Sequence, residues 1–257
     1  MTDLESHLRG VLTRRKILAP YLMCGFPSPE LFPEMVAGVV EAGADLLEIG
    51  IPFSDPLMDG PVIQRAGDVA LRAEVRPPAV LRTMAAVSPG VPYVLMTYVN
   101  PVLAMGAEAF ADEAKGSGAA GVIVPDLPPE EGEGWSRVAK DRGLAPVFMA
   151  APTTPGTRLH RIVELGAGFV YCVSLLGVTG VRSSLSDRAR QVVTRVREAT
   201  DRPALVGLGV STPEQAAKAC SFADGVIVGS ALLKAVEDEG LAKAVDLVRS
   251  MRDALDK

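Results

Sequence analysis

The stretch LLEIGIPFSDPLMDGPVIQ, residues 46–64, joins a short apolar run to a loop rich in turn-forming residues. The apolar run, residues 46–51, is partly β-branched and bounded by turn residues, which indicates a buried parallel strand. Proline, glycine and aspartate crowd into residues 52–61, a composition typical of a loop. Glu48 therefore stands among the apolar residues of a strand, and Asp59 stands in the loop that follows.

These two carboxylates suggest acid–base chemistry. A carboxylate among apolar neighbours destabilises the fold unless it is paired with a positive charge, is protonated, or has a function that requires it there. Burial raises its pKa, which suits a group that gives and takes a proton near neutrality, and a second carboxylate in a different environment permits separate acid and base roles. The residues alone leave a plainer alternative open, in which Glu48 reaches solvent at a strand end while Asp55 and Asp59 only form turns.

Composition excludes several classes of protein. The chain has 257 residues, is 48% hydrophobic and 22% charged, and carries a net charge of −5. The acidic balance and the lack of a basic run argue against a nucleic-acid partner. Three widely spaced cysteines indicate reduced thiols and a cytoplasmic location. The charged N-terminus and the absence of an apolar run of about 18 residues predict no signal peptide and no membrane association.

Apolar runs alternate with segments of helical periodicity along the whole chain. Strands are expected at 17–23, 46–51, 93–98, 121–125, 145–150, 169–175, 204–208 and 225–229. Helices are expected at 30–41, 79–87, 108–115, 130–142, 157–164, 186–199, 213–220 and 231–253. Eight such units predict an α/β fold, a (β/α)8 TIM barrel that forms one domain over residues 1–257. Extra helices are expected at 3–14, on the barrel floor, and at 61–73.

A doubly wound open sheet is the alternative fold. It typically has five or six strands and a glycine-rich turn after the first of them. Here the first strand is followed by Cys24-Gly25-Phe26-Pro27, which lacks that pattern.

The last two units have the features of a phosphate site. Gly207 and Gly209 end the seventh strand, and Gly229-Ser230 begins the eighth helix. Glycine lets the backbone approach a ligand closely, and helix N-terminal amides attract anions. In barrels, the loops after strands seven and eight commonly bind phosphate.

Missing residue types narrow the reaction. No lysine falls at the carboxyl end of an expected strand, so a Schiff-base aldolase has no nucleophile. His7 and His160 fall in helical segments, which argues against a metal site. We therefore expect proton transfer on a phosphorylated substrate, with no metal and no organic cofactor.

The segment at 46–64 resembles the signature of the tryptophan synthase alpha subunit family. Further motifs match in order, namely YVNP (98–101), VPDLPPEE (124–131), SLLGVTG (174–180), GLGVS (207–211) and DGVIVGSAL (224–232). The resemblance implies a lyase that cleaves indole-3-glycerol phosphate into indole and glyceraldehyde 3-phosphate, a retro-aldol step in tryptophan biosynthesis. It also implies a pyridoxal-phosphate beta subunit as partner in an alpha2beta2 complex.

The resemblance implies a role for each matching residue. Glu48 would be the general acid and base, and Asp59 would bind the indole N–H; Thr179 and Tyr171 would support them. The apolar indole slot would be lined by Tyr21, Met96, Ile123 and Leu208. Backbone amides of Gly180, Gly209, Gly229 and Ser230 would hold the phosphate. The partner interface would include Pro52, Asp55 and Asn100.

Several positions depart from the family pattern. Met58 replaces a common alanine, Tyr21 and Leu208 replace common phenylalanines, and Leu175-Leu176 replaces a polar pair. Three other functions remain open: a stand-alone lyase that releases free indole, a catalytically weak subunit that mainly activates a beta partner, and another phosphate-binding barrel. The last of these would need acid–base residues on strands one and five, where we find Tyr21, Met23, Phe148 and Met149.

Overall fold

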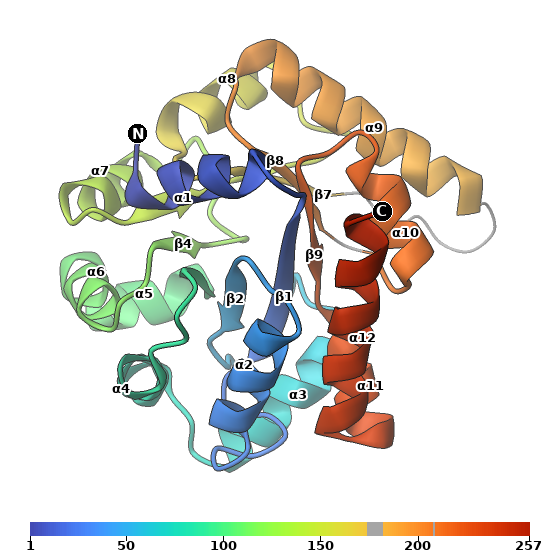
Figure 1. The fold of residues 1–257 in the computed structure, drawn as a ribbon. Coiled ribbons are helices and arrows are strands. Elements are labelled where there is room, and N and C mark those ends of the chain that lie inside the picture. The colour runs from blue at the N-terminus through green and yellow to red at the C-terminus, as the bar shows by residue number, and fades with distance from the viewer. Residues whose placement is uncertain (174–181, 208) are drawn as a thin grey trace.

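The computed structural model describes residues 1–173, 182–207 and 209–257 of the chain. Its strands form one parallel sheet that curves into a barrel with helices around it (Figure 1). The strands are β1 (Ile17–Met23), β2 (Leu47–Gly50), β3 (Tyr93–Met96), β4 (Gly121–Ile123), β5 (Ala145–Val147), β6 (Met149–Ala150), β7 (Val170–Val173), β8 (Ala204–Gly207) and β9 (Gly225–Val228). They are ordered β5-β4-β3-β2-β1-β9-β8-β7-β6, and this confirms the expected barrel.

The fifth expected strand differs from the prediction because it is interrupted at Phe148. β5 pairs with β4 and β6 pairs with β7, so each of the two pieces forms hydrogen bonds with a different adjacent strand. The Phe148 carbonyl still accepts a hydrogen bond of 3.2 Å from the Tyr171 backbone N–H. The ring of strands therefore continues through the interruption.

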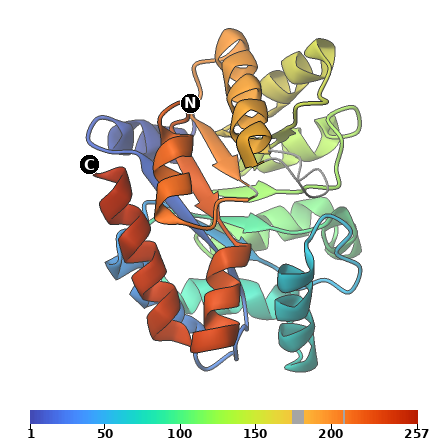
Figure 2. The same ribbon diagram turned by 90° about the vertical axis from the view of Figure 1, so that its right-hand side faces the viewer.

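The helices cover the outside of the barrel (Figure 2). They are α1 (Asp3–Leu12), α2 (Phe32–Glu41), α3 (Pro61–Arg72), α4 (Pro77–Val87), α5 (Val99–Met105), α6 (Ala107–Gly116), α7 (Glu133–Asp141), α8 (Gly156–Leu165), α9 (Arg182–Ala199), α10 (Pro213–Cys220), α11 (Ser230–Glu239) and α12 (Leu241–Leu255). The single helix expected at 231–253 is wrong: Gly240 adopts a φ of +88° and separates α11 from α12. Helix α5 was not expected either; Asp126 accepts a 2.9 Å hydrogen bond from the Val99 N–H at its start.

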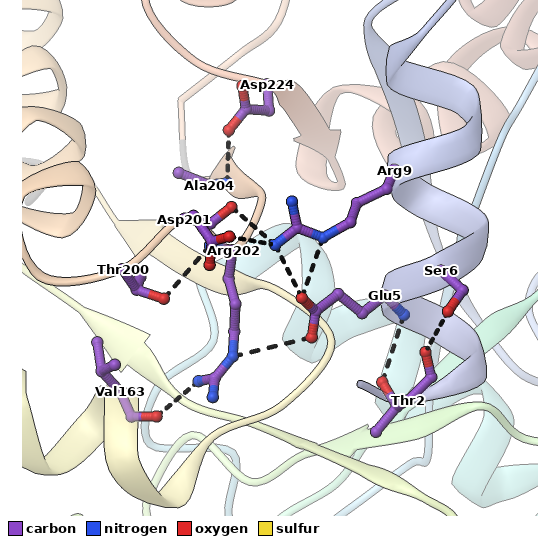
Figure 3. Close-up of polar contacts among 10 residues, drawn as sticks. All are labelled: Thr2, Glu5, Ser6, Arg9, Val163, Thr200, Asp201, Arg202, Ala204 and Asp224. Atoms are coloured by element: carbon purple, nitrogen blue, oxygen red, sulfur yellow. Dashed lines mark hydrogen bonds and ion pairs between the residues drawn. The ribbon is translucent and has the colours of Figure 1, made fainter.

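Helix α1 closes the floor of the barrel, as predicted. Leu4 and Leu8 are fully buried, and a Cβ on Gly168, just before β7, would lie 2.9 Å from the Leu4 Cδ2 atom. An ionic cluster holds the helix in place (Figure 3): Arg9 binds Glu5 at 3.0 Å and Asp201 at 3.1 Å. The Glu5 carboxylate is largely buried and so better shielded from water than an ordinary surface group, whereas Asp201 is exposed and its pair with Arg9 adds little stability.

The C-terminal helix is attached to the same floor. Arg252 of α12 binds the buried Asp45 carboxylate at 2.9 Å and the Lys16 carbonyl at 3.0 Å. Asp45 also accepts hydrogen bonds from Arg15 and from the Leu18 N–H. A buried carboxylate needs such partners, because breaking a buried pair typically costs about 3–5 kcal/mol.

Strand side chains alternate between the barrel interior and the helices. The register pairs Tyr21 with Glu48 across β1 and β2, so both side chains point into the interior at one level. In the part of the chain that the structure describes, every helix is too short or too polar to cross a lipid bilayer.

Candidate active site

A cavity of about 340 Å³ opens at the carboxyl ends of the strands. The cavity is lined by side chains of seven strands, by the loops after β2, β4, β8 and β9, and by the first turns of α3 and α11. The lining residues are Tyr21, Glu48, Met58, Asp59, Ile63, Met96, Ile123, Pro125, Met149, Tyr171, Gly209, Val210, Ser211, Ile227, Gly229 and Ser230. Active sites of this barrel class form at this face. The cavity therefore gathers most of the residues that the sequence nominated.

Glu48 lies on the cavity wall with 4% of its surface exposed. Burial raises the pKa of its carboxyl group to about 8, and the charge of Asp59 adds to the rise. Its Oε2 atom is buried and has no hydrogen-bond partner among the described residues. A carboxyl group in this state is protonated at neutral pH and can act as an acid.

Asp59 is half-buried in the loop after β2. Burial raises its pKa to about 6, and a hydrogen bond from the Tyr98 hydroxyl acts in the opposite direction. Tyr98 also fixes the loop, because it accepts a 3.1 Å hydrogen bond from the Met58 N–H and its ring stacks on Phe53 at 5.2 Å. Glu48 and Asp59 therefore hold pKa values on opposite sides of 7, as a divided acid–base pair requires.

Two tyrosines, Tyr21 on β1 and Tyr171 on β7, lie in matching surroundings. A Cβ on Gly50 would lie 2.7 Å from the Tyr21 Cζ atom, and a Cβ on Gly207 would lie 2.5 Å from the Tyr171 Cζ atom. In both cases the glycine lies two residues beyond the register partner of the tyrosine on the adjacent strand. Burial, followed by the nearby carboxylates, raises the pKa of both phenols well above 10, so each hydroxyl keeps its proton.

The other end of the cavity is formed by backbone. Gly209 adopts a φ of +92°, which favours glycine, and Gly229 precedes the first turn of α11. Ser230, the first residue of that helix, and Ser211 complete this end. Free amides at the start of a helix suit an anion such as phosphate.

Three of the expected site residues, Thr179, Gly180 and Leu208, lie outside the described residues. Seven lining residues were not singled out from the sequence for the site: Met58, Ile63, Pro125, Met149, Val210, Ser211 and Ile227. The period-two pattern of GVIVG, residues 225–229, places Ile227 on the same face as Gly229 and could have identified it. Ser211 lies in a loop and has no comparable signal.

The residues expected at a partner interface follow the carboxyl ends of β2 and β3, and none of them lines the cavity. Asp55 and Asn100 are exposed, whereas Pro52 is buried. Leu57 is 88% exposed in the same loop, and Leu103 of α5 is 64% exposed. A larger hollow of about 640 Å³ lies beside Leu103, between α5, α6 and α7. It does not contain the paired carboxylates, so the smaller cavity is the candidate active site.

Comparison with known proteins gives one consistent result. The family model described as tryptophan synthase alpha chain matches residues 11–255. The tryptophan synthase alpha chain of Streptomyces avermitilis is 46% identical over 246 residues, which cover 95% of this chain and 89% of that protein. That of Carboxydothermus hydrogenoformans is 46% identical over 91% of this chain and 87% of that protein.

Solved structures agree with this result. A ligand-free tryptophan synthase structure from M. tuberculosis matches with a TM-score of 0.92 and 37% identity over 100% of both chains. The alpha subunit from Legionella pneumophila matches with a TM-score of 0.91 and 37% identity over 100% of this chain and 99% of that one. The chain therefore belongs to the tryptophan synthase alpha chain family, the lyases that cleave indole-3-glycerol phosphate.

Proposed function

We propose that the chain cleaves indole-3-glycerol phosphate in the 340 Å³ cavity, with Glu48 as the general acid and base and Asp59 as the fixed anion. The observation that carries this assignment is the pair of carboxylates in one cavity, with pKa values of about 8 and about 6. At pH 7 the first group is mainly protonated and the second mainly ionised. Each is in the form that its role requires.

The reaction divides into two proton transfers. Glu48 donates a proton to C3 of the indole ring, and Asp59 accepts a hydrogen bond from the ring N–H and stabilises the positive charge that develops. The Glu48 carboxylate then removes the proton from the hydroxyl on the carbon attached to the ring. The bond between that carbon and C3 breaks, and its electron pair returns to the ring. Indole and glyceraldehyde 3-phosphate are released, and Glu48 has regained its proton.

The remaining lining residues hold the substrate. Met96 and Ile123 supply apolar walls for the ring, and Tyr171 positions Glu48 or the glycerol hydroxyls. The phosphate binds at the Gly209, Gly229 and Ser230 end, because α11 begins there and the first amides of a helix have no partner within the helix. Thr179, Gly180 and Leu208 belong to the same proposal by their place in the family motifs.

Replacement of Glu48 tests the assignment. Glu48→Gln keeps the shape and removes the proton, so indole release should fall by about 10²–10⁴-fold. Binding of indole-3-propanol phosphate, which has the same ring and phosphate, should change by less than about threefold. Glu237→Gln, which alters an exposed carboxylate paired with Arg65, is the matched control and should leave turnover unchanged. Undiminished turnover in Glu48→Gln would refute the assignment.

The surface around the cavity mouth is the proposed site for a pyridoxal-phosphate beta subunit in an alpha2beta2 complex. Large apolar side chains exposed together mark interaction sites, and Leu57, Met58 and Leu103 are exposed near Asp55 and Asn100. The M. tuberculosis matches include structures of tryptophan synthase in an aminoacrylate-bound form. The stand-alone lyase is not favoured by these relatives.

Indole release with and without a beta subunit tests the partner. Release should be slow from the chain alone and should rise sharply with the partner. Leu57→Asp should abolish most of this stimulation, because it places a charge in an apolar contact. Val69→Asp, at an exposed apolar position on α3, is the control and should leave the stimulation intact. Fast release of indole that does not change when the beta subunit is added would contradict the proposed complex.

A further inference from the structure

Two buried polar atoms of the cavity residues have no hydrogen-bond partner among the described residues: the Tyr21 hydroxyl and Glu48 Oε2. Tyr21 is 3% exposed and Glu48 is 4% exposed. A buried polar atom without a hydrogen-bond partner destabilises a folded protein, because it has lost its hydrogen bonds to water. Unsatisfied polar atoms of this kind are found at functional sites, where a bound ligand supplies the missing hydrogen-bond partner.

The other tyrosines make this observation specific. The Tyr93 hydroxyl donates a 2.6 Å hydrogen bond to the Ser117 carbonyl, and the Tyr98 hydroxyl accepts one from the Met58 N–H. The Tyr171 hydroxyl is not among the buried atoms that lack a partner. The buried phenol oxygen recorded without a partner among the described residues is that of Tyr21, which lines the cavity with Glu48.

The strand register explains why the two atoms face one volume. Tyr21 and Glu48 are direct partners across β1 and β2, so both side chains leave the sheet on the interior side. The Tyr21 ring leans over Gly50, one interior position above Glu48 and nearer the cavity mouth. Both side chains therefore belong to the same stretch of the cavity wall, with the two unsatisfied atoms buried in it.

We propose that the Tyr21 hydroxyl is a catalytic group that, with Glu48 Oε2, binds the substrate hydroxyl on the carbon attached to the indole ring. That hydroxyl donates its hydrogen to Glu48 Oε2 and accepts a hydrogen bond from Tyr21, so both unsatisfied atoms gain a partner. When Glu48 takes the proton, negative charge develops on the substrate oxygen before the carbonyl forms. The Tyr21 O–H stabilises that charge and keeps its own proton.

This inference rests on the proposed cleavage and extends it. An apolar slot for the indole ring requires only an aromatic side chain at position 21. Phenylalanine would form that wall of the slot without leaving a hydroxyl unsatisfied. The face of the Tyr21 ring lines the slot, while the hydroxyl at its tip recognises the glycerol chain. The same side chain therefore contributes to ring binding and to the bond-breaking step.

Tyr21→Phe tests the proposal against a matched variant, Tyr93→Phe, whose hydroxyl has a protein partner. Tyr21→Phe should lower kcat/KM for indole-3-glycerol phosphate by about 10–100-fold. It should change the Kd for indole-3-propanol phosphate, which lacks the glycerol hydroxyls, by less than about twofold. Tyr93→Phe should leave both quantities unchanged.

Thermal unfolding adds a readout that packing alone would not produce. The melting temperature should stay the same or rise in Tyr21→Phe, which removes an unpaired hydroxyl, and should fall in Tyr93→Phe, which breaks a hydrogen bond. Equal losses for substrate and analogue in Tyr21→Phe would overturn the proposal, since they would indicate wall packing. Unchanged kcat/KM, or a fall in melting temperature like that of Tyr93→Phe, would also overturn it. If the unmodified chain released no indole, the proposed cleavage itself would fail, which is a distinguishable result.

Discussion

The ring of Tyr21 occupies the space that a side chain on Gly50 would need. A Cβ on Gly50 would lie 2.7 Å from the Tyr21 Cζ atom, closer than real Cβ contacts allow. Gly50 follows Glu48 by two residues on β2, so it is the next interior position. The missing side chain thus lets an aromatic ring lie directly above the proposed acid.

Gly50→Ala should therefore displace Tyr21 and disturb the site. We expect a loss of about 1–3 kcal/mol in the free energy of unfolding from overpacking. We also expect a fall of at least about tenfold in kcat/KM, because the ring beside Glu48 must move. Chemical denaturation and steady-state kinetics measure the two effects.

A double-mutant cycle with Tyr21→Leu tests the cause of that loss. The shorter side chain no longer fills the space above Gly50, so Gly50→Ala should cost clearly less in this background. Additive costs would show that the alanine acts on something other than Tyr21.

The pH dependence of kcat/KM should be bell-shaped. Activity should rise with pH through about 6 as Asp59 ionises and fall through about 8 as Glu48 loses its proton. Asp59→Asn should remove the acidic limb and leave the basic limb in the low activity that remains. A single-limbed profile in the unmodified enzyme would contradict the division of roles.

Glu48→Gln should stabilise the fold at alkaline pH. The folded-state pKa of Glu48, about 8, lies above its ordinary value of 4.5, so the folded chain binds the extra proton between these pH values and stability falls as pH rises through them. Glutamine removes this loss, so the variant should be about 2–4 kcal/mol more stable than the unmodified chain at pH 8.5. The difference should shrink near pH 5, as urea unfolding at both pH values would reveal. A difference that did not vary with pH would contradict the raised pKa.

Leu4→Ala should weaken the barrel floor without altering the site. Leu4 is fully buried against the strand ends near Gly168, and its truncation should cost about 2–5 kcal/mol. Below the melting temperature, KM and kcat should be unchanged, because α1 lies at the opposite end of the barrel from the cavity. Leu103→Ala, at an exposed position, should change stability by less than about 0.5 kcal/mol.

Hydrophobic periodicity predicted the barrel because buried parallel strands are short apolar runs, as at 93–96 and 225–228. It could not predict breaks that depend on a single residue. Gly240 carries no periodic signal, yet its φ of +88° ends a helix. The interruption at Phe148 arises because two pieces of one strand pair with different neighbours, which is a tertiary effect.

The candidate site, like the fold, was predictable from the sequence only in part. Glu48 and Asp59 could be nominated because a carboxylate in an apolar strand and an aspartate in the next loop are visible in the chain. The different pKa values of these two carboxyl groups depend on burial and on Tyr98, which lies far from Asp59 in the sequence and contacts its loop only in the folded chain. The unpaired hydroxyl of Tyr21 was beyond prediction, since an unsatisfied atom is defined only by everything that surrounds it.

The attachment of both terminal helices to the barrel floor has a practical consequence. Leu4 of α1 and Arg252 of α12 anchor the two ends of the chain at the amino ends of the strands, and the cavity opens at the other end. An affinity tag, a fluorescent label or a solid support joined to either end would stand on the far side from the substrate entrance. The molecule can therefore be tethered by either terminus with its working face directed into solution.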